Sequence, residues 1–91
     1  MFYFFDLYLD FHHFYNSFFK GNEIEFIYKS KRYYIVPHYD DNDEIIGVEL
    51  GEANSTVNTI CLSTSGLYNA AIGDTVFGEA LSNIEIVHYN C

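Results

Sequence analysis

The chain has 91 residues, of which 49% are hydrophobic, and it carries a net charge of −9 at neutral pH. This length suits one small domain, residues 1–91, with an adequate but not a generous core. The acidic balance argues against direct binding to nucleic acid or to an anionic membrane surface, because both would repel the chain.

The first segment predicts a helix over residues 4–20. Its polar side chains recur at steps of four and three, which places them in one narrow stripe: Asp6, Asp10, His13, Ser17 and Lys20. Aromatic and aliphatic side chains cover most of the remaining helix surface, and Gly21 is a typical C-terminal stop. So wide an apolar face can cover a sheet and still leave rings for a second subunit, which predicts a homodimer through this helix.

Residues 23–36 predict a β-hairpin. Ile24, Phe26 and Tyr28 alternate with more polar neighbours, and Tyr33 and Ile35 do the same in a second run. The polar residues between the runs predict a tight turn with Ser30 and Lys31 at its tip.

A third strand is expected after an acidic loop. Pro37 has no N–H for a strand ladder, so the second strand should end there or lie on a sheet edge. The composition of residues 40–44 is typical of a loop. Ile46, Val48 and Leu50 then alternate as one face of the next strand. We therefore expect an antiparallel meander with one apolar face.

The last third of the chain predicts short elements. Residues 59–62 suit either a fourth strand or the entry into a short helix, and residues 66–72 suit one or two helical turns with Ser65 as a cap. Asp74 or Thr75 is expected to cap a helix over residues 76–82. Residues 84–89 alternate like a strand but could also continue that helix. The predicted fold class is α+β: an N-terminal helix packed on a three- or four-stranded antiparallel sheet, with short C-terminal helices.

The acids are unevenly distributed along the chain. The first 32 residues are neutral, whereas residues 33–91 hold nine acids and no Lys or Arg. A field of this kind attracts a basic protein surface, although net acidity that only keeps a chain soluble is the commoner case. The crowding of acids between residues 40 and 52 favours an interaction role. The predicted partner-binding residues are Tyr39, Asp40, Asp41, Asp43, Glu44, Glu49 and Glu52.

Catalytic and metal-binding motifs are not recognisable in the sequence. The acidic loop departs from a calcium loop, which has acids at positions one, three and five followed by Gly: Asp41 and Asp43 fit this pattern, but Ile45 does not. His88 and Cys91 have a metal-ligand spacing, but two ligands at a chain end are a weak signal. Neither a nucleophile–base arrangement nor a glycine-rich phosphate loop can be argued from spacing. We expect a binding protein without cofactor or metal, not an enzyme.

The N-terminal segment and the small number of cysteines indicate a cytoplasmic location. Asp6 and Asp10 interrupt the first apolar stretch, which also lacks the basic start and small-residue cleavage site of a signal peptide. A membrane span is disfavoured for the same reason. Two cysteines do not make a disulfide framework, which suits a reducing compartment.

About two thirds of the chain resembles small acidic proteins of phages and mobile elements, some of which are anti-CRISPR proteins. The residues that carry the resemblance are Asn22-Glu23-Ile24-Glu25-Phe26-Ile27-Tyr28-Lys29, Lys31-Arg32-Tyr33-Tyr34-Ile35, Ile45-Ile46-Gly47 and Ile72-Gly73-Asp74-Thr75-Val76-Phe77. Ser30 stands where those proteins usually have Gly in the turn, and Asp74 where Lys is common. The resemblance implies an inhibitor that binds a CRISPR effector nuclease directly and blocks its binding or cleavage of nucleic acid.

Two classes of function fit these features. An acidic inhibitor can occupy the basic channel of a nucleic-acid enzyme as a DNA mimic, with tyrosines stacking on arginines. The alternative is an immunity-type or antitoxin-type protein that neutralises a toxin, or a phage protein that acts by oligomerising.

Overall fold

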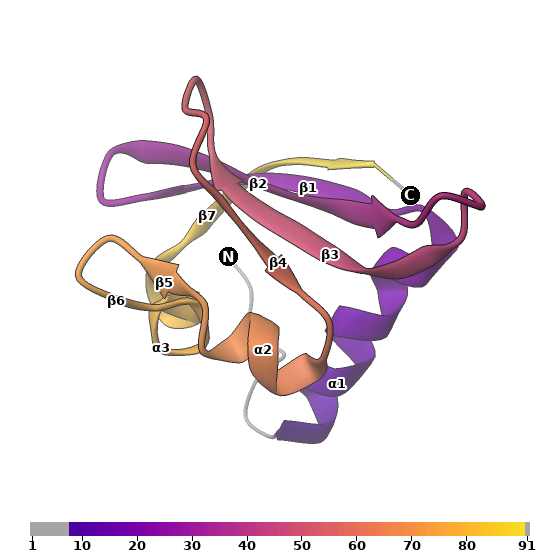
Figure 1. Cartoon of the computed structure of the whole chain (residues 1–91). Coiled ribbons are helices and arrows are strands. Elements are labelled where there is room, and N and C mark those ends of the chain that lie inside the picture. Colours follow the sequence, from indigo (N-terminus) through magenta and orange to yellow (C-terminus); the bar gives the residue numbers. More distant parts are fainter. Residues whose placement is uncertain (1–7, 91) are drawn as a thin grey trace.

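The computed structural model describes residues 8–90 and confirms the α+β fold class (Figure 1). One antiparallel sheet has the strand order β4-β3-β2-β1-β7. Its strands are β1 (Glu23–Tyr28), β2 (Lys31–Tyr39), β3 (Ile45–Glu52), β4 (Asn58–Cys61) and β7 (Glu85–Asn90). The other elements are α1 (Tyr8–Ser17), η1 (Phe18–Lys20), α2 (Thr64–Tyr68), β5 (Ala71–Ile72), β6 (Thr75–Val76), α3 (Phe77–Ala80) and η2 (Leu81–Asn83). In Figure 1 the labelled helices lie together on one side of the sheet.

The predicted N-terminal helix is present as α1 and a final 3₁₀ turn, η1. Gly21 ends it in the left-handed conformation, at φ 91°, and donates its N–H to the carbonyl of Phe18 at 3.0 Å. A residue without Cβ adopts this conformation at little cost, which confirms Gly21 as the stop. Residues 4–7 of the predicted helix, Asp6 among them, lie outside the described residues.

Most of the described aromatic rings of this helix face the interior of the molecule. Phe11, Tyr15 and Phe18 are buried, whereas Phe19 is exposed. The ring of Phe11 meets Tyr68 edge to face at a centroid distance of 5.2 Å, so the helix packs on the C-terminal half as well as on the sheet. This leaves less aromatic surface for a second subunit than the sequence suggested, and the homodimer through the helix stays a prediction.

The β1–β2 hairpin has the predicted alternation, but its tip is one residue earlier than expected. Tyr28 pairs with Lys31, so Lys29 and Ser30 are the two central turn residues. Both have positive φ, 50° and 69°, as a type I′ turn requires. The expected tip at Ser30 and Lys31 was wrong because Lys31, although polar, begins the next strand.

The second strand does not end at Pro37. Strand β2 runs on to Tyr39 between β1 and β3, and Pro37 pairs with Val48. The pairing with β1 reaches only to Ile35, so Pro37 lies beyond that ladder. A proline is tolerated there because no β1 residue needs its missing N–H.

Strand β3 keeps the predicted face only in part. Val48 and Leu50 are buried as expected, but Ile46 is exposed. The register of β2 and β3 shifts between His38 and Tyr39, which changes the face that Ile46 presents.

The short elements of the C-terminal half differ from prediction at their starts. Ser63, not Ser65, caps α2, because its hydroxyl accepts the N–H of Gly66 at 3.0 Å. Neither Asp74 nor Thr75 caps α3, which begins at Phe77 after Val76 without a side-chain cap bond. The N–H of Phe77 instead bonds to the carbonyl of Ala70 at 2.8 Å.

The two segments that the sequence left open are both strands. Residues 58–61 form β4, paired with β3, and residues 85–90 form β7, paired with β1. Among the described residues the sheet therefore has five strands, where three or four were expected. The pairing of β7 joins the end of the described chain to its first strand, a contact between residues far apart in sequence.

Candidate interaction surface

The acidic loop, residues 40–44, closes the hairpin between β2 and β3. The N–H of Asp40 bonds to the carbonyl of Glu44 at 2.9 Å, and the N–H of Asp43 to the carbonyl of Asp40 at 3.1 Å. Asp43 has a φ of 63°, a conformation that Asp and Asn tolerate better than most residues. These bonds give the loop a defined backbone.

The carboxylate of Asp40 helps to build the loop. Its Oδ1 accepts the N–H of Asn42 at 2.8 Å and the N–H of Glu44 at 3.0 Å. Two charge-assisted bonds of this kind stabilise a turn that backbone bonds alone hold weakly. Asp40 is therefore a structural residue of the loop, and a variant that removes it together with the other acids would change the loop conformation as well as its charge.

Three further carboxylates of the loop point to solvent. Asp41, Asp43 and Glu44 are exposed, and none of them forms an ion pair within the part of the chain that the structure describes. Tyr39 precedes them and is 50% exposed. We call Tyr39, Asp41, Asp43 and Glu44 the acidic tip. Their role in binding a partner stays a prediction.

Glu49 lies apart from the acidic tip and is engaged within the chain. Its Oε2 accepts the hydroxyl of Tyr34 at 2.7 Å and the side-chain amide of Asn58 at 3.2 Å. The bond to Glu49 raises the pKa of the Tyr34 phenol. The Tyr34 ring lies over Gly51, where a Cβ would meet its hydroxyl. Glu49 thus connects three neighbouring strands on the sheet face away from the core.

Glu52 is at the opposite end of β3 from the acidic tip. An extended strand rises about 3.3 Å per residue, so Glu44 and Glu52 are separated by about 25 Å. The acids of residues 40–52, adjacent in sequence, are thus divided among the tip, the middle and the far end of one strand. The predicted partner-binding set does not form a single patch.

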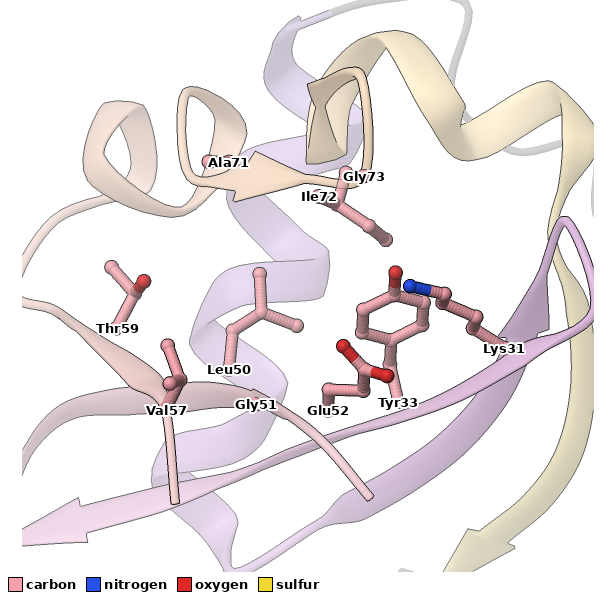
Figure 2. Close-up of a pocket in the computed structure, with 10 residues that line it drawn as sticks. All are labelled: Lys31, Tyr33, Leu50, Gly51, Glu52, Val57, Thr59, Ala71, Ile72 and Gly73. Atoms are coloured by element: carbon pink, nitrogen blue, oxygen red, sulfur yellow. The ribbon is translucent and has the colours of Figure 1, made fainter. Parts of the chain in front are cut away.

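A small open cavity of about 140 Å³ lies beside Glu52, between the sheet and the β5–β6 hairpin (Figure 2). The polar ends of Lys31, Tyr33 and Glu52 gather at one side of it, and Leu50 and Ile72 supply apolar lining. Burial raises the pKa of Tyr33, and the nearby carboxylate of Glu52 adds to the shift. Ligand pockets commonly measure about 300–1,000 Å³, so this cavity suits a few water molecules better than a substrate.

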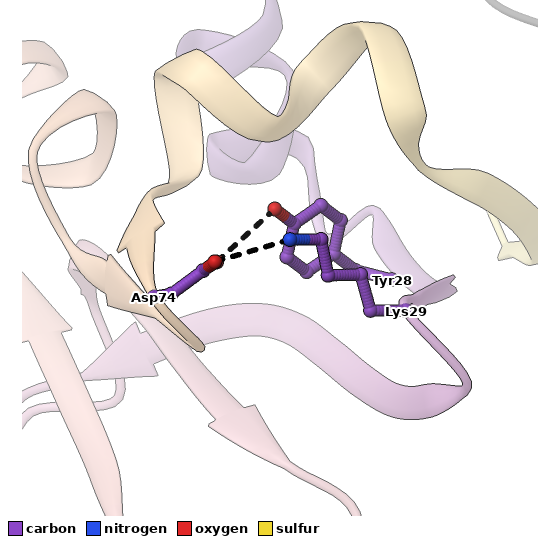
Figure 3. A network of polar contacts seen from close by, with 3 residues as sticks. All are labelled: Tyr28, Lys29 and Asp74. Carbon is purple, nitrogen blue, oxygen red and sulfur yellow. Dashed lines mark hydrogen bonds and ion pairs between the residues drawn. The ribbon is translucent and has the colours of Figure 1, made fainter.

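The basic hairpin is partly neutralised within the chain. Lys29 donates to Asp74 at 3.1 Å, and the hydroxyl of Tyr28 donates to the same carboxylate at 3.4 Å (Figure 3). Arg32 donates to Glu25 at 2.9 Å. The bond with Asp74 raises the pKa of Lys29, and the bond with Lys29 lowers the pKa of Asp74. These contacts connect the β1–β2 hairpin to the β5–β6 turn, and both ion pairs are exposed.

Sequence reasoning missed an exposed apolar group around β4. Val57 and Leu62 are 73% and 63% exposed, and Ile60 between them is 41% exposed. Residues 53–73 contain no Asp, Glu, Lys, Arg or His, which was the available signal. That signal was not decisive, because an uncharged segment can equally be a buried one.

The described residues show neither a metal-ligand cluster nor a membrane-spanning helix. They contain no group of three His, Cys, Asp or Glu side chains that could hold a metal ion. Within the same part of the chain, the helices are too short or too polar to cross a membrane. Burial raises the pKa of Cys61 to about 11, so this thiol is a poor nucleophile at neutral pH.

Comparisons with family models, with curated proteins and with solved structures found no match to the chain. The resemblance to anti-CRISPR proteins therefore depends on the sequence runs quoted for it.

Proposed function

We propose that the protein is a direct-binding inhibitor of a basic nucleic-acid enzyme, and that a CRISPR effector nuclease is the first target to test. The observation that supports the proposal is the acidic tip: three exposed carboxylates without intramolecular ion pairs among the described residues, on a loop with a defined backbone. The resemblance noted in the sequence supports the choice of target.

The acidic tip has the chemistry of a phosphate mimic. Channels that hold nucleic acid are lined with Arg and Lys, which pair with carboxylates as they do with phosphates. Tyr39 lies next to the acids and offers a ring on which an Arg side chain can stack. Charge on exposed side chains mainly accelerates association, so the acids should act first on the on-rate.

A preorganised loop makes such binding more favourable. Ordering a flexible loop on binding costs conformational entropy, whereas the Asp40 carboxylate already fixes the backbone of Asn42 and Glu44. The chain can therefore present the tip carboxylates without first ordering the loop. The charge of the remaining chain also favours a basic protein over nucleic acid as the partner, because residues 33–91 contain no Lys or Arg that would attract nucleic acid.

The proposal is tested by a pull-down with purified CRISPR effectors, with and without guide RNA, using wild type and Asp41→Asn/Asp43→Asn/Glu44→Gln. The variant keeps Asp40 and the loop bonds but removes three charges from the tip. The matched control is Glu23→Gln/Glu79→Gln/Glu85→Gln, which removes three exposed acids elsewhere and has the same net charge.

We expect the tip variant to bind and inhibit at least about tenfold more weakly than wild type, and the control to lose much less. Binding should also weaken as salt screens the exposed charges. If both variants lose the same affinity, the acidic tip acts only through the net charge of the chain. Capture of a basic toxin with no binding to any effector would instead favour the antitoxin class.

A further inference from the structure

Strand β4 is a sheet edge with an open backbone. Among the described residues it pairs with β3 on one side only, and three of its four residues, Asn58, Thr59 and Ile60, are exposed. Alternate N–H and C=O groups of an edge strand have no ladder partner, so such a strand can accept another strand. Leu62 extends the exposed apolar surface beside Ile60, and Val57 is exposed at the other end of the strand, where it lines the cavity next to the β5–β6 hairpin. We call residues 57–62 the β4 edge.

The other sheet edge, β7, carries features that discourage strand addition. Glu85 and His88 are exposed on it, and its register against β1 shifts between Glu25 and Phe26. Charges and bulges of this kind are common ways to protect an edge. The β4 edge has neither charge, nor proline, nor a register shift against β3. The two edges of the same sheet therefore differ in how they can associate.

The absence of charge also indicates what the β4 edge can accept. A basic partner would be recognised by acids, and this segment has none. Two copies of a chain with a net charge of −9 repel each other over most of their surface, but residues 53–73 contribute no charge to that repulsion. We propose that the β4 edge pairs antiparallel with the β4 edge of a second copy, which joins two five-stranded sheets into one.

The sheet faces restrict the register of this pairing. Ile60 pairs with Glu49, so it lies on the same face as Glu49, away from the core, while its neighbour Cys61 is buried. Residues opposite each other in an antiparallel pair must share a face. A two-fold axis at Ile60 satisfies this condition and brings the two copies of Ile60 together. Asn58 of each copy then lies opposite Leu62 of the other.

Such an assembly closes at two copies. An isologous pairing uses the β4 edge of both chains and leaves two β7 edges, which carry charge and a shifted register. The pairing is short, and stable interfaces usually bury about 1,200–2,000 Å². We therefore expect a weak, concentration-dependent dimer. This inference does not depend on the proposed function.

Salt should strengthen the dimer. The repulsion between two acidic chains is screened as the Debye length falls from about 10 Å at 0.1 M salt to about 3 Å at 1 M salt. Backbone pairing and apolar contact are insensitive to that screening. The β4 edge and the acidic tip therefore have opposite salt dependences.

The first test is sedimentation equilibrium over a wide concentration range at both salt levels, with wild type, Ile60→Lys and Val87→Lys. Val87 is 37% exposed on the β7 edge, close to the 41% of Ile60, and both variants change the net charge equally. For wild type we expect a mass that rises from 10.6 kDa toward twice that value, more readily at high salt. Ile60→Lys should weaken association about tenfold, and Val87→Lys should leave it unchanged.

The second test is cross-linking in a Cys91→Ser background. Ile60→Cys should form a disulfide-linked dimer under mild oxidation, because directly opposite Cβ atoms lie about 4.5–5.5 Å apart and need only a small shift to reach the roughly 3.5–4.5 Å that a disulfide spans. Val87→Cys should remain monomeric under the same conditions. Melting temperatures of all variants show whether each is folded.

Three results would overturn the proposal. The first is a strict monomer at every concentration and salt level. The second is an equal response of Ile60→Lys and Val87→Lys, since only one of these edges is proposed to pair. The third is loss of the dimer in Phe19→Ser but not in Ile60→Lys, which would place the interface on the N-terminal helix, where Phe19 is exposed.

Discussion

The acidic tip and the β4 edge lie on neighbouring parts of one sheet but offer a partner opposite chemistry. The tip presents side-chain charge on a backbone whose hydrogen bonds are made within the loop. The edge presents apolar side chains in a segment without charge, and its outer backbone groups have no ladder partner among residues 8–90. Charge acts over a Debye length and steers encounters, whereas strand pairing acts only at contact. The two proposed recognition surfaces therefore need not compete.

The Gly47→Ala variant tests how closely β4 is held to β3. A Cβ at this position would lie 2.4 Å from the backbone carbonyl oxygen of Cys61, so β3 and β4 must move apart. We expect a loss of about 1–3 kcal/mol in the free energy of unfolding, as for other overpacked sites. Self-association should also fall, because the displaced strand is the one that pairs.

Gly51→Ala is the control for that experiment. Its Cβ would meet the hydroxyl of Tyr34 at a similar distance, but that group is the end of a side chain and can rotate away. Denaturant unfolding should rank Gly47→Ala as clearly less stable than Gly51→Ala. A reversed order would mean that β4 is held less closely to β3 than the structure indicates.

A second prediction concerns the tip. Asp40→Ala removes the acceptor for the N–H groups of Asn42 and Glu44, and a net cost of about 1 kcal/mol follows from typical values for such bonds. Asp40→Asn keeps an oxygen acceptor and should lose less. Unfolding curves measure both costs. The same pair of variants separates loop order from charge, because each removes one negative charge and only one removes the acceptor.

If Asp40→Ala and Asp40→Asn bind the target equally well, loop order has no part in recognition. If only Asp40→Ala is impaired, the conformation of the tip contributes in addition to its charge.

Local patterns predicted the first hairpin and the tip better than any other part. The alternation of Ile24, Phe26 and Tyr28 gave the buried face of β1. The turn was displaced by one residue because Lys29 and Ser30 adopt positive φ without the Asn or Gly that usually marks a type I′ turn. The tip residues all lie within residues 39–44, so sequence proximity was enough to group them.

Features that depend on non-local pairing were not predictable in the same way. Glu49 and Glu52 were grouped with the tip, but a strand carries them away from it by about 3.3 Å per residue. The uncharged segment was visible in the sequence, yet only the strand order places β4 at an edge. The pairing of β7 with β1 likewise joins residues that no local pattern relates.

The smallest expected effect concerns the ion pair between Lys29 and Asp74, which lies outside both surfaces. The bond with Lys29 lowers the pKa of Asp74 below its ordinary value of 3.8, so its contribution is present above that pH and is lost as the pH falls through the folded-state pKa. The bond with Asp74 raises the pKa of Lys29 above 10.5, so that contribution is present below that pH and is lost as the pH rises through the raised value. The pair should therefore be fully effective between these limits.

Asp74→Asn tests this contribution against Glu85→Gln, an exposed acid without an ion pair among the described residues. Because the pair is solvent-exposed, we expect the melting temperature at neutral pH to fall by less than about 4 °C. The difference from wild type should shrink in high salt and below the pKa of Asp74. Asp74→Asn should not alter target binding or self-association, since the ion pair only connects the β1–β2 hairpin to the β5–β6 turn. A large change in target binding would mean that the acidic tip surface extends to the β1–β2 hairpin. A large change in self-association would mean the same for the β4 edge.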